Sequence, residues 1–322
     1  MKKIEVKNKV ILAPMAGFTD GAFRTIAFES GADIAISEMV SAKAMKYGDK
    51  KTFDLLKTYR EEKEVGIQIF GSDPEILAFA CSYLDKDPKV NLIDLNLGCP
   101  APKIFKNGEG SALLDNPKKI YELLSAMRKK TSKTLSGKIR LGISDKNNYL
   151  DLARAVEEAG ADFITVHGRT RDEYYSGQAD WEAIGNIKAN LSIPVVGNGD
   201  IGFDTDIKKL LADYKVDGLM IGRHAVGSPW IFSKVKADLL GEEYSYPSIE
   251  EKFSIMIEHI NLACDLKNER VAIPELRKHL HSYLKGFPKA AQIKNQINSV
   301  KAKKELIELL TSYRDWLLTY DK

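Results

Sequence analysis

Short apolar runs with the character of β-strands alternate with amphipathic helical segments over the first three quarters of the chain. This alternation is typical of α/β proteins with a parallel sheet, because each helix carries the chain back to the start of the next strand. We expect strands at 10–13, 34–38, 65–70, 92–96, 134–140, 163–167, 194–198 and 218–221. Eight strand–helix units in about 240 residues fit a (β/α)8 TIM barrel better than an open sheet.

The alternation stops near residue 244, and only helical periodicity follows it. The expected helices are 248–267, 274–285, 289–299 and 301–319, with breaks at Pro274, Gly286 and Pro288. We therefore predict a TIM barrel over residues 1–243 and a small C-terminal all-helical domain over 247–322, joined by a short linker. Within the barrel, the segment 41–59 is compatible with helix, loop or both.

Composition and cysteine spacing exclude several classes of protein. The 322 residues carry a net charge of +3 and are 44% hydrophobic, which is ordinary for a globular protein. Cys81, Cys99 and Cys264 are far apart, which argues against a disulfide framework or a zinc site and for a reducing, cytoplasmic compartment. No stretch approaches the roughly 18 apolar residues of a membrane span, so we expect no membrane association. We also expect no metal, from the cysteine spacing, and take a monomer as the default.

The basic surplus of the chain is confined to its last quarter. Between residues 276 and 304 there is no Asp or Glu. The basic residues of this stretch are Arg277, Lys278, Lys285, Lys289, Lys294, Lys301, Lys303 and Lys304. Such a run predicts either a surface that attracts a polyanion or an ordinary solvated helix face.

Polar or otherwise unusual residues stand where the predicted strands end. They are Pro14, Met15, Ala16, Glu38, Gln68, Asn96, Cys99, Lys138, Arg140, His167, Asn198 and Arg223. TIM-barrel active sites are built at the carboxyl ends of the strands. A single buried polar residue is more often a satisfied core group, but the complete series predicts an active site at the barrel mouth.

Two of these strand ends are rich in glycine. Residues 197–202 fit the pattern GxGxxG, but a dinucleotide-binding motif belongs to the first turn of a Rossmann unit, and this one follows the seventh strand. In TIM barrels, the loops after strands seven and eight commonly hold a phosphate. We expect the backbone N–H groups of Gly199, Asp200, Gly222 and Arg223 to face a phosphate, with the Asp200 side chain turned away.

Taken together, these segments resemble the tRNA-dihydrouridine synthases, flavin enzymes that reduce the C5–C6 double bond of uridines in transfer RNA. The most specific part of the resemblance is the Asn-Leu-Gly-Cys-Pro element at 96–100. The other matching segments are 13–20, 68–71, 138–142, 166–170, 197–201 and 218–223 in the barrel, and 276–280 and 283–286 beyond it. The resemblance covers nearly the whole chain.

The family resemblance implies roles for individual residues. Cys99 would be the general acid, flavin mononucleotide (FMN) the cofactor, and NADPH or NADH the electron donor. The residues that would hold the cofactor are Pro14, Met15, Ala16, Gln68, Lys138, His167, Asn198, Gly199, Asp200, Gly222 and Arg223. Those that would contact the transfer RNA are Asn96 and Arg140 at the target uridine, Arg169 and Tyr174 at the barrel mouth, and Arg277, Lys278 and Lys285 on the helical domain.

The residue types suit this chemistry. Reduction of the C5–C6 bond needs a hydride at C6, which reduced flavin can supply, and a proton at C5. A cysteine with a pKa near 8.5 is mostly protonated at pH 7, yet acidic enough to donate its proton. Lys103 lies nearby in sequence, so a thiolate role for Cys99 stays open. Lys138 would be the counterion of the reduced flavin, or alternatively one half of a surface ion pair.

The loop 101–114, which contains Gly108 and Gly110, is long enough to close over a bound base. A uridine in folded RNA must leave its stack to reach a barrel mouth, so the target would be flipped or already unstacked. Arg169 and Tyr174 have an alternative role in ordinary loop packing. Two other functions remain open, namely a flavin barrel acting on a free pyrimidine and a non-catalytic RNA-binding protein.

Overall fold

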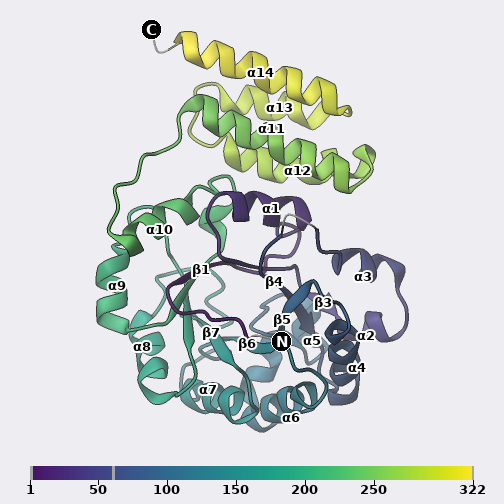
Figure 1. The fold of residues 1–322 in the computed structure, drawn as a ribbon, viewed down its shortest axis with the longest axis vertical. Coiled ribbons are helices and arrows are strands. Elements are labelled where there is room, and N and C mark those ends of the chain that lie inside the picture. The colour runs from purple at the N-terminus through teal and green to yellow at the C-terminus, as the bar shows by residue number, and fades with distance from the viewer. Residues whose placement is uncertain (1–2, 60–61, 321–322) are drawn as a thin grey trace.

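The computed structural model describes residues 3–59 and 62–320, and it shows a closed parallel barrel with a helical bundle beside it (Figure 1). Each barrel strand pairs in parallel with its neighbours, in the order β1, β2, β4, β5, β6, β7, β8, β9 and back to β1. The strands are β1 (Lys9–Leu12), β2 (Ile34–Ile36), β4 (Val65–Phe70), β5 (Val90–Leu97), β6 (Thr134–Arg140), β7 (Phe163–His167), β8 (Val195–Asn198) and β9 (Gly218–Ile221). The predicted TIM barrel is therefore confirmed.

A short additional strand, β3 (Val40–Ser41), pairs with the end of β4 and was not predicted. Helices cover the outside of the barrel (Figure 1). They are α1 (Gly21–Glu29), α2 (Ala42–Lys46), α3 (Lys50–Leu55), α4 (Pro74–Asp85), α6 (Pro117–Arg128), α7 (Tyr149–Glu158), α8 (Trp181–Asn190), α9 (Ile207–Tyr214) and α10 (Ile231–Leu240). The short helix α5 (Pro102–Lys106) and the 3-10 helices η1 (Gly110–Asp115) and η2 (Arg223–Ala225) belong to the loops that follow β5 and β9. The undecided segment 41–59 contains two short helices joined by loops.

Apolar side chains hold each strand from both faces. Ile11, Leu92 and Phe163 point into the barrel and form its interior core. Leu12 and Ile93, one residue further along, pack outward against the helices, because successive side chains of a strand point to opposite faces. The strand ends are therefore held on both sides, and the side chains at the mouth start from fixed backbone positions.

Four helices follow the barrel and pack around a core of their own. They are α11 (Ile249–Leu266), α12 (Glu269–Tyr283), α13 (Ala290–Ser299) and α14 (Lys303–Tyr320). The all-helical character predicted for this region is confirmed, whereas the predicted helix start at Pro274 was wrong. Asn268 caps α12 by accepting a hydrogen bond from the N–H of Arg270, and Pro274 lies inside the helix. The missing N–H of an exposed proline is tolerated there because buried Ile273 and Leu276 anchor the helix in the core.

The helical bundle rests on α1. Every residue from 21 to 28 is buried, because α1 packs between the barrel and α11. Ala22 and Trp230, both from the barrel region, belong to the apolar core of the bundle. Lys267 on the loop after α11 forms an ion pair with Asp20 at 2.7 Å. These contacts fix the bundle against one side of the barrel.

The predicted domain limits at residues 1 and 322 lie outside the described residues. Among the residues that the structure does describe, no helix is both long and apolar enough to cross a membrane. Within the same residues, no three His, Cys, Asp or Glu side chains gather as they would around a metal ion.

Candidate active site at the barrel mouth

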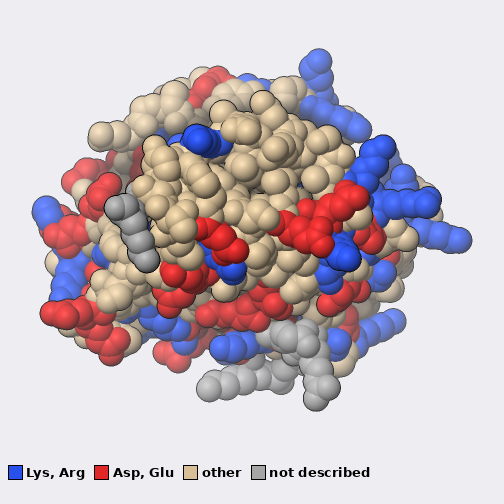
Figure 2. All heavy atoms as spheres, turned by 90° about the horizontal axis from the view of Figure 1, so that it is seen from above, with Lys and Arg blue, Asp and Glu red and all other residues tan. Residues whose placement is uncertain are grey.

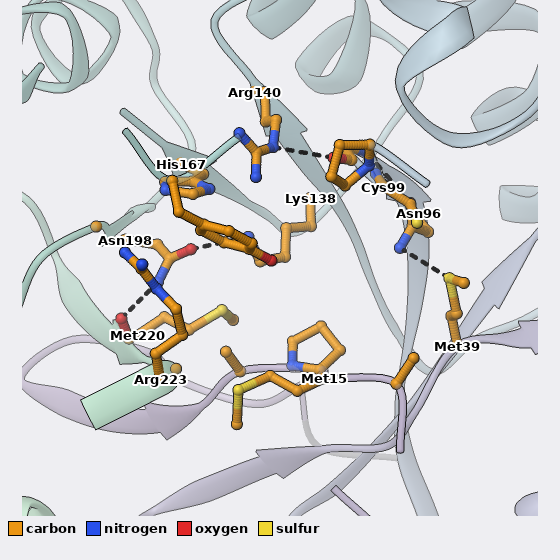
Figure 3. A pocket seen from close by; sticks show the side chains of 18 of the residues that line it. Met15, Met39, Asn96, Cys99, Lys138, Arg140, His167, Asn198, Met220 and Arg223 are labelled. Carbon is orange, nitrogen blue, oxygen red and sulfur yellow. Dashed lines mark hydrogen bonds between the residues drawn. The ribbon is translucent and has the colours of Figure 1, made fainter. Parts of the chain in front are cut away.

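The carboxyl ends of the barrel strands surround a cavity of about 530 Å³ (Figure 3). All parallel strands end at the same rim, so residues that are far apart in the sequence meet there. The predicted site residues that line this cavity are Pro14, Met15, Ala16, Gln68, Asn96, Cys99, Lys138, Arg140, His167, Tyr174, Asn198, Gly199, Asp200, Gly222 and Arg223. The structure thus brings together the barrel residues predicted to form the site, with the exceptions of Glu38 and Arg169, which do not line the cavity.

A buried chain of hydrogen bonds leads from the barrel interior to the turn that carries Cys99. Gln68 donates from Nε2 to Asp94 Oδ2 at 2.7 Å, and Gln68 Oε1 accepts from Asn96 Nδ2, also at 2.7 Å. Asn96 Oδ1 in turn accepts from the backbone N–H of Cys99 at 2.9 Å. A carboxylate only accepts hydrogen bonds, so Asp94 determines which way both amides face. Two neighbouring strands thereby position the cysteine turn.

The thiol of Cys99 lies at the cavity wall and is partly buried. The carbonyl of this residue accepts a hydrogen bond from Ser111 Oγ at 2.7 Å, and a side chain at Gly110 would come within 3.1 Å of Cys99 Cβ, so η1 packs closely on this turn. Burial raises the pKa of the Cys99 thiol, although the Ala101 N–H and the charge of Arg140 act in the opposite direction. The thiol therefore keeps its proton at neutral pH.

Lys138 extends from β6 into the cavity (Figure 3). Its Nζ donates to Asn198 Oδ1 at 2.9 Å, and Asn198 Nδ2 donates to the carbonyl of Met220 at 2.8 Å. Burial, together with the positive charge of Arg140, lowers the pKa of Lys138 to about 7, while Asp94 acts to raise it. A lysine in this state is easily recharged by an anion placed beside it.

His167 at the end of β7 stays neutral. Burial, followed by the charges of Lys138 and Arg140, holds the pKa of His167 far below its usual range. Arg169 Nη1 lies 3.3 Å from His167 Nε2. A guanidinium only donates, so Nε2 accepts and the ring proton lies on Nδ1. Arg169 itself is buried behind the cavity wall and forms an ion pair with Asp200 at 2.6 Å.

The loops after β8 and β9 contribute Gly199, Asp200, Gly222 and Arg223 to the wall of the same cavity as Lys138. Gly199 has a φ of +136°, a conformation that favours glycine, and a side chain at this position would also collide with Ala179. The carboxylate of Asp200 accepts from the N–H of Ala179 at 2.7 Å and contacts Arg223 at 3.3 Å. Its side chain is thus held by the loop and by arginines.

Arg140 braces the two loops that flank the mouth. Its Nε donates to the carbonyl of Gly98 at 3.1 Å, and its Nη1 donates to the carbonyls of Thr170 and Tyr174 at 2.8 and 2.9 Å. The ring of Tyr175, which is 50% exposed, lies 5.5 Å from the Arg140 guanidinium and 4.3 Å from that of Arg223. Arg140 therefore links the Cys99 turn to the aromatic loop after β7.

These features are compatible with the predicted flavin. Pro14, Met15 and Ala16 offer apolar contacts to a flat ring, and Lys138, which bonds to Asn198, offers a buried amine that an anion would recharge. The cavity wall formed by the glycine-containing loops after β8 and β9, with Arg223 beside it, suits a phosphate. The partly buried, protonated thiol of Cys99 faces the same cavity, so proton transfer to a bound molecule is the chemistry open to it.

Comparison with known proteins identifies the family. Residues 11–316 match the family model described as Dihydrouridine synthase (Dus). The chain belongs to the dihydrouridine synthase family. The resemblance recognised from the motifs is thereby confirmed over nearly the full length.

Family members of similar length share about a third of their residues with this chain. A probable tRNA-dihydrouridine synthase of Rickettsia bellii is 35% identical over 316 residues, which span 96% of this chain and 97% of that protein. The tRNA-dihydrouridine synthase B of Shewanella oneidensis is 36% identical over 316 residues, 98% of each chain. That of Proteus vulgaris is 36% identical over 312 residues, 96% of each chain.

Solved structures with much lower sequence identity share the fold. Histamine dehydrogenase from Rhizobium sp. 4-9 aligns with 80% of this chain at a TM-score of 0.54 and 14% identity. A 2-naphthoyl-CoA reductase aligns with 74% of this chain at a TM-score of 0.55 and 14% identity. The chain spans about half the length of these two proteins, 49% and 50% respectively.

The predicted RNA contacts on the helical region lie outside the cavity. Arg277 Nη2 donates to the carbonyl of Val300 at 3.2 Å, so this side chain joins two parts of the bundle. Lys278 Nζ lies 4.9 Å from the ring centroid of Phe18, a residue of the cavity wall. Lys285 is exposed beyond the end of α12. Seen from above the bundle, basic side chains gather toward one side of the molecule, and acidic ones lie across the middle (Figure 2).

Sequence reasoning missed several residues of the site. Phe18, Met39, Met220 and His224 also line the cavity, and Asp94 stands behind it. Met39 Sδ lies 3.8 Å from Asn96 Nδ2 (Figure 3). Asp94 could have been found from the sequence, because it is an acidic residue within an apolar strand. A buried carboxylate requires hydrogen-bond donors, so its position indicated polar partners nearby.

Proposed function

We propose that this chain is a tRNA-dihydrouridine synthase, which reduces specific uridines of transfer RNA to 5,6-dihydrouridine with bound FMN and with NADPH or NADH as electron donor. In this proposal the barrel, residues 1–243, binds the flavin, and the helical domain, residues 247–322, binds the RNA. Family membership supports the reaction. The observation that carries the mechanism is the partly buried thiol of Cys99 in the same cavity as Lys138 (Figure 3).

Different residues around the cavity would bind the ring and the phosphate of the flavin. Pro14, Met15 and Ala16 would contact the ring, and Gln68 and Lys138 would lie at its polar edge, with His167 nearby. The residues that would hold the phosphate are Asn198, Gly199, Asp200, Gly222 and Arg223. At Asp200 the backbone N–H would serve, because its carboxylate is bonded to the loop and to Arg169.

Reduced FMN, when bound, supplies a hydride to C6 of the uracil ring. Cys99 Sγ gives its proton to C5, so that one hydride and one proton complete the saturation of the bond. The thiolate that remains lies near the positive charge of Arg140 and recovers a proton from water. In these steps Cys99 is the general acid. The raised pKa of its thiol agrees with this role better than with a nucleophilic role, which needs a thiolate.

Recognition of RNA would involve both parts of the chain. Asn96 and Arg140 would contact the target uridine, and Arg169 and Tyr174 would shape the mouth through which it enters. Arg277, Lys278 and Lys285 would hold the body of the RNA through its phosphates. We further propose that the protein acts as a cytoplasmic monomer.

Replacement of Cys99 tests this mechanism. We expect Cys99→Ser to keep its bound flavin, seen as yellow colour, and to lose most of its turnover, measured as dihydrouridine in a transfer RNA transcript by mass spectrometry. The matched control is Cys264→Ser on α11, which should retain both properties. Undiminished dihydrouridine formation by Cys99→Ser would rule out the general-acid role.

Two further measurements distinguish the alternatives. Turnover of free uridine or orotate at rates equal to those with RNA would favour an enzyme acting on free pyrimidines. A purified protein that is colourless and takes up no FMN would favour a non-catalytic RNA-binding protein. Mapping of dihydrouridine in RNA from cells with and without the gene would identify the modified positions.

A further inference from the structure

The loop between β1 and α1, residues 13–20, forms part of the active-site wall. The residues of this loop that line the cavity are Ala13, Pro14, Met15, Ala16 and Phe18. The chain leaves β1 after the N–H of Ala13, which donates to the carbonyl of Ile221 at 2.9 Å. Beyond this point the loop lies outside the sheet, so contacts other than the strand pairing hold it in place.

Hydrogen bonds within the loop link Met15 to Phe18. The N–H groups of Phe18 and Thr19 both donate to the carbonyl of Met15, at 2.9 and 3.0 Å. The N–H of Met15 donates in turn to Thr19 Oγ1 at 3.0 Å. A shift of Phe18 is therefore transmitted to the backbone of Met15, which lines the cavity where the flavin ring is proposed to bind (Figure 3).

On the barrel side, Glu38 holds Gly17, the residue between Ala16 and Phe18. Oε1 of Glu38 accepts a hydrogen bond from the N–H of Gly17. Gly17 has a φ of +78°, a conformation that favours glycine. Burial raises the pKa of Glu38, whereas the Gly17 N–H and the charge of Lys278 act in the opposite direction. Lys278 of α12 is thus close enough to act on the carboxylate that holds the loop.

On the bundle side, two consecutive residues of α12 contact Phe18. The ring of buried His279 meets that of Phe18 edge to face, with 5.3 Å between the centroids and an angle of 72°. Half-buried Lys278 places its Nζ 4.9 Å from the centroid of the Phe18 ring, and a Cβ added at Gly17 would lie 3.0 Å from the same atom. Burial holds the pKa of His279 well below its usual range, so its ring is neutral at pH 7 and does not repel Lys278.

We propose that Lys278 and His279 are positioning residues of the cofactor site, which act on the flavin through Phe18. The inference rests on the proposed function, because the molecule that the loop contacts is the flavin proposed there. A cation beside an aromatic face is attracted to the ring, so Lys278 stabilises the observed position of Phe18. Molecules in which the loop has left this position bind the flavin only after it returns, so this contact lowers the apparent Kd for FMN. The helical bundle thereby completes one wall of the active site.

Variants of Lys278 test the proposal by titration of the flavin-depleted, full-length protein with FMN in the absence of RNA. Lys278→Met should raise the Kd for FMN about threefold, the fold-change that corresponds to one cation–π contact at a partly exposed site. It should also change the visible circular dichroism of the bound flavin, because the wall beside the ring shifts. Lys278→Arg keeps a cation beside Phe18, and it should retain the wild-type Kd and spectrum.

The matched control is Lys252→Met on α11. Lys252 Nζ lies 5.6 Å from the ring centroid of Trp230, so it too is a bundle lysine beside an aromatic ring of the barrel region, but Trp230 does not line the active-site cavity. This variant should bind FMN as the wild type does. In a Phe18→Leu background, Lys278→Met should have no further effect on the Kd, because the ring that the lysine contacts is absent.

A wild-type Kd and flavin spectrum in Lys278→Met would overturn the proposal. An equally large rise in Kd in the Phe18→Leu background would also overturn it, in favour of a direct effect of the lysine charge on the cofactor. If Phe18→Leu does not fold, as judged by thermal unfolding, the comparison of Lys278→Met with Lys278→Arg decides, and equal Kd values refute the proposal. Contact of Lys278 with RNA does not affect these measurements, and a wild-type protein that binds no FMN would refute the proposed function itself.

Discussion

Lys138 allows a quantitative test of the proposed flavin site. Burial and the nearby charge of Arg140 lower the pKa of Lys138 to about 7 in the free protein. An anion bound beside Nζ favours the charged form and therefore raises this pKa. Above pH 7, the binding of an anionic cofactor must then take up a proton, so its affinity falls as the pH rises.

The size of the effect follows from the fraction of Lys138 that is charged. For a pKa of about 7, that fraction is about one half at pH 7 and about 3% at pH 8.5, so the apparent Kd should rise about fifteenfold over this interval. Well below pH 7 the lysine is already charged, and it contributes no further pH dependence. A phosphate group loses its second proton near pH 6, so its own titration lies mostly below the chosen interval.

The assay is an anaerobic titration of flavin-depleted protein with chemically reduced FMN at pH 7 and at pH 8.5, followed by protein fluorescence, because the reduced ring is the anion that Lys138 would face. Lys138→Arg should bind with little pH dependence, because a guanidinium stays charged at both values. Lys138→Met should bind weakly, and equally so at both. A wild-type Kd that stays constant over this interval, or a Lys138→Met variant that shows the same rise, would refute the reasoning.

The remaining predictions concern the titration of His259, the hydrogen bonds of Gln68, and the buried ion pair of Arg24 with Glu62. Burial lowers the pKa of His259 to about 4, so stability is lost as the pH falls from 6.5 toward 4. We expect a loss of about 2 kcal/mol at pH 5, measured by urea unfolding relative to His259→Gln; a constant difference from pH 7 to 5 would contradict this. Gln68→Leu removes one hydrogen bond from Asp94 Oδ2 and one from Asn96 Nδ2, and it should cost about 2–4 kcal/mol and most of the turnover. Ile67→Val should cost about 1 kcal/mol and keep the turnover. Arg24→Ala leaves Glu62 buried and uncompensated, so a loss of about 3–5 kcal/mol in the free energy of unfolding is expected, and a value below 1 kcal/mol would argue against a buried pair.

Much of the barrel followed from local pattern. The predicted bounds of β4, β6, β7 and β9 agree with the structure residue for residue, because short apolar runs report directly which strands are buried. The two-residue β3 carries too few side chains for any periodicity to show. The start of α12 was misplaced because Pro274 was interpreted as a helix boundary, whereas the packing of Ile273 and Leu276 outweighs one missing hydrogen bond.

The composition of the mouth was also accessible from sequence, since the polar residues follow the strands and parallel strands end at one rim. The hydrogen bonds between these residues could not be predicted from sequence. The pairing of Gln68 with Asp94 depends on the register between β4 and β5, in which these two residues lie side by side. The packing of the whole barrel sets that register, and the sequence around Gln68 or around Asp94 does not reveal it.

The sequence by itself therefore determined the barrel, the helical region after it, and most of the polar side chains at the mouth. Only the tertiary structure decided that Asp94 orients the Cys99 turn through two amides, and that the helical bundle contacts the active-site wall at Phe18. The physical reason is that periodicity records which face of each element is buried. Hydrogen-bond partners and cavities between elements arise instead from contacts between residues that are distant in the chain, and these contacts form only when all the elements pack together.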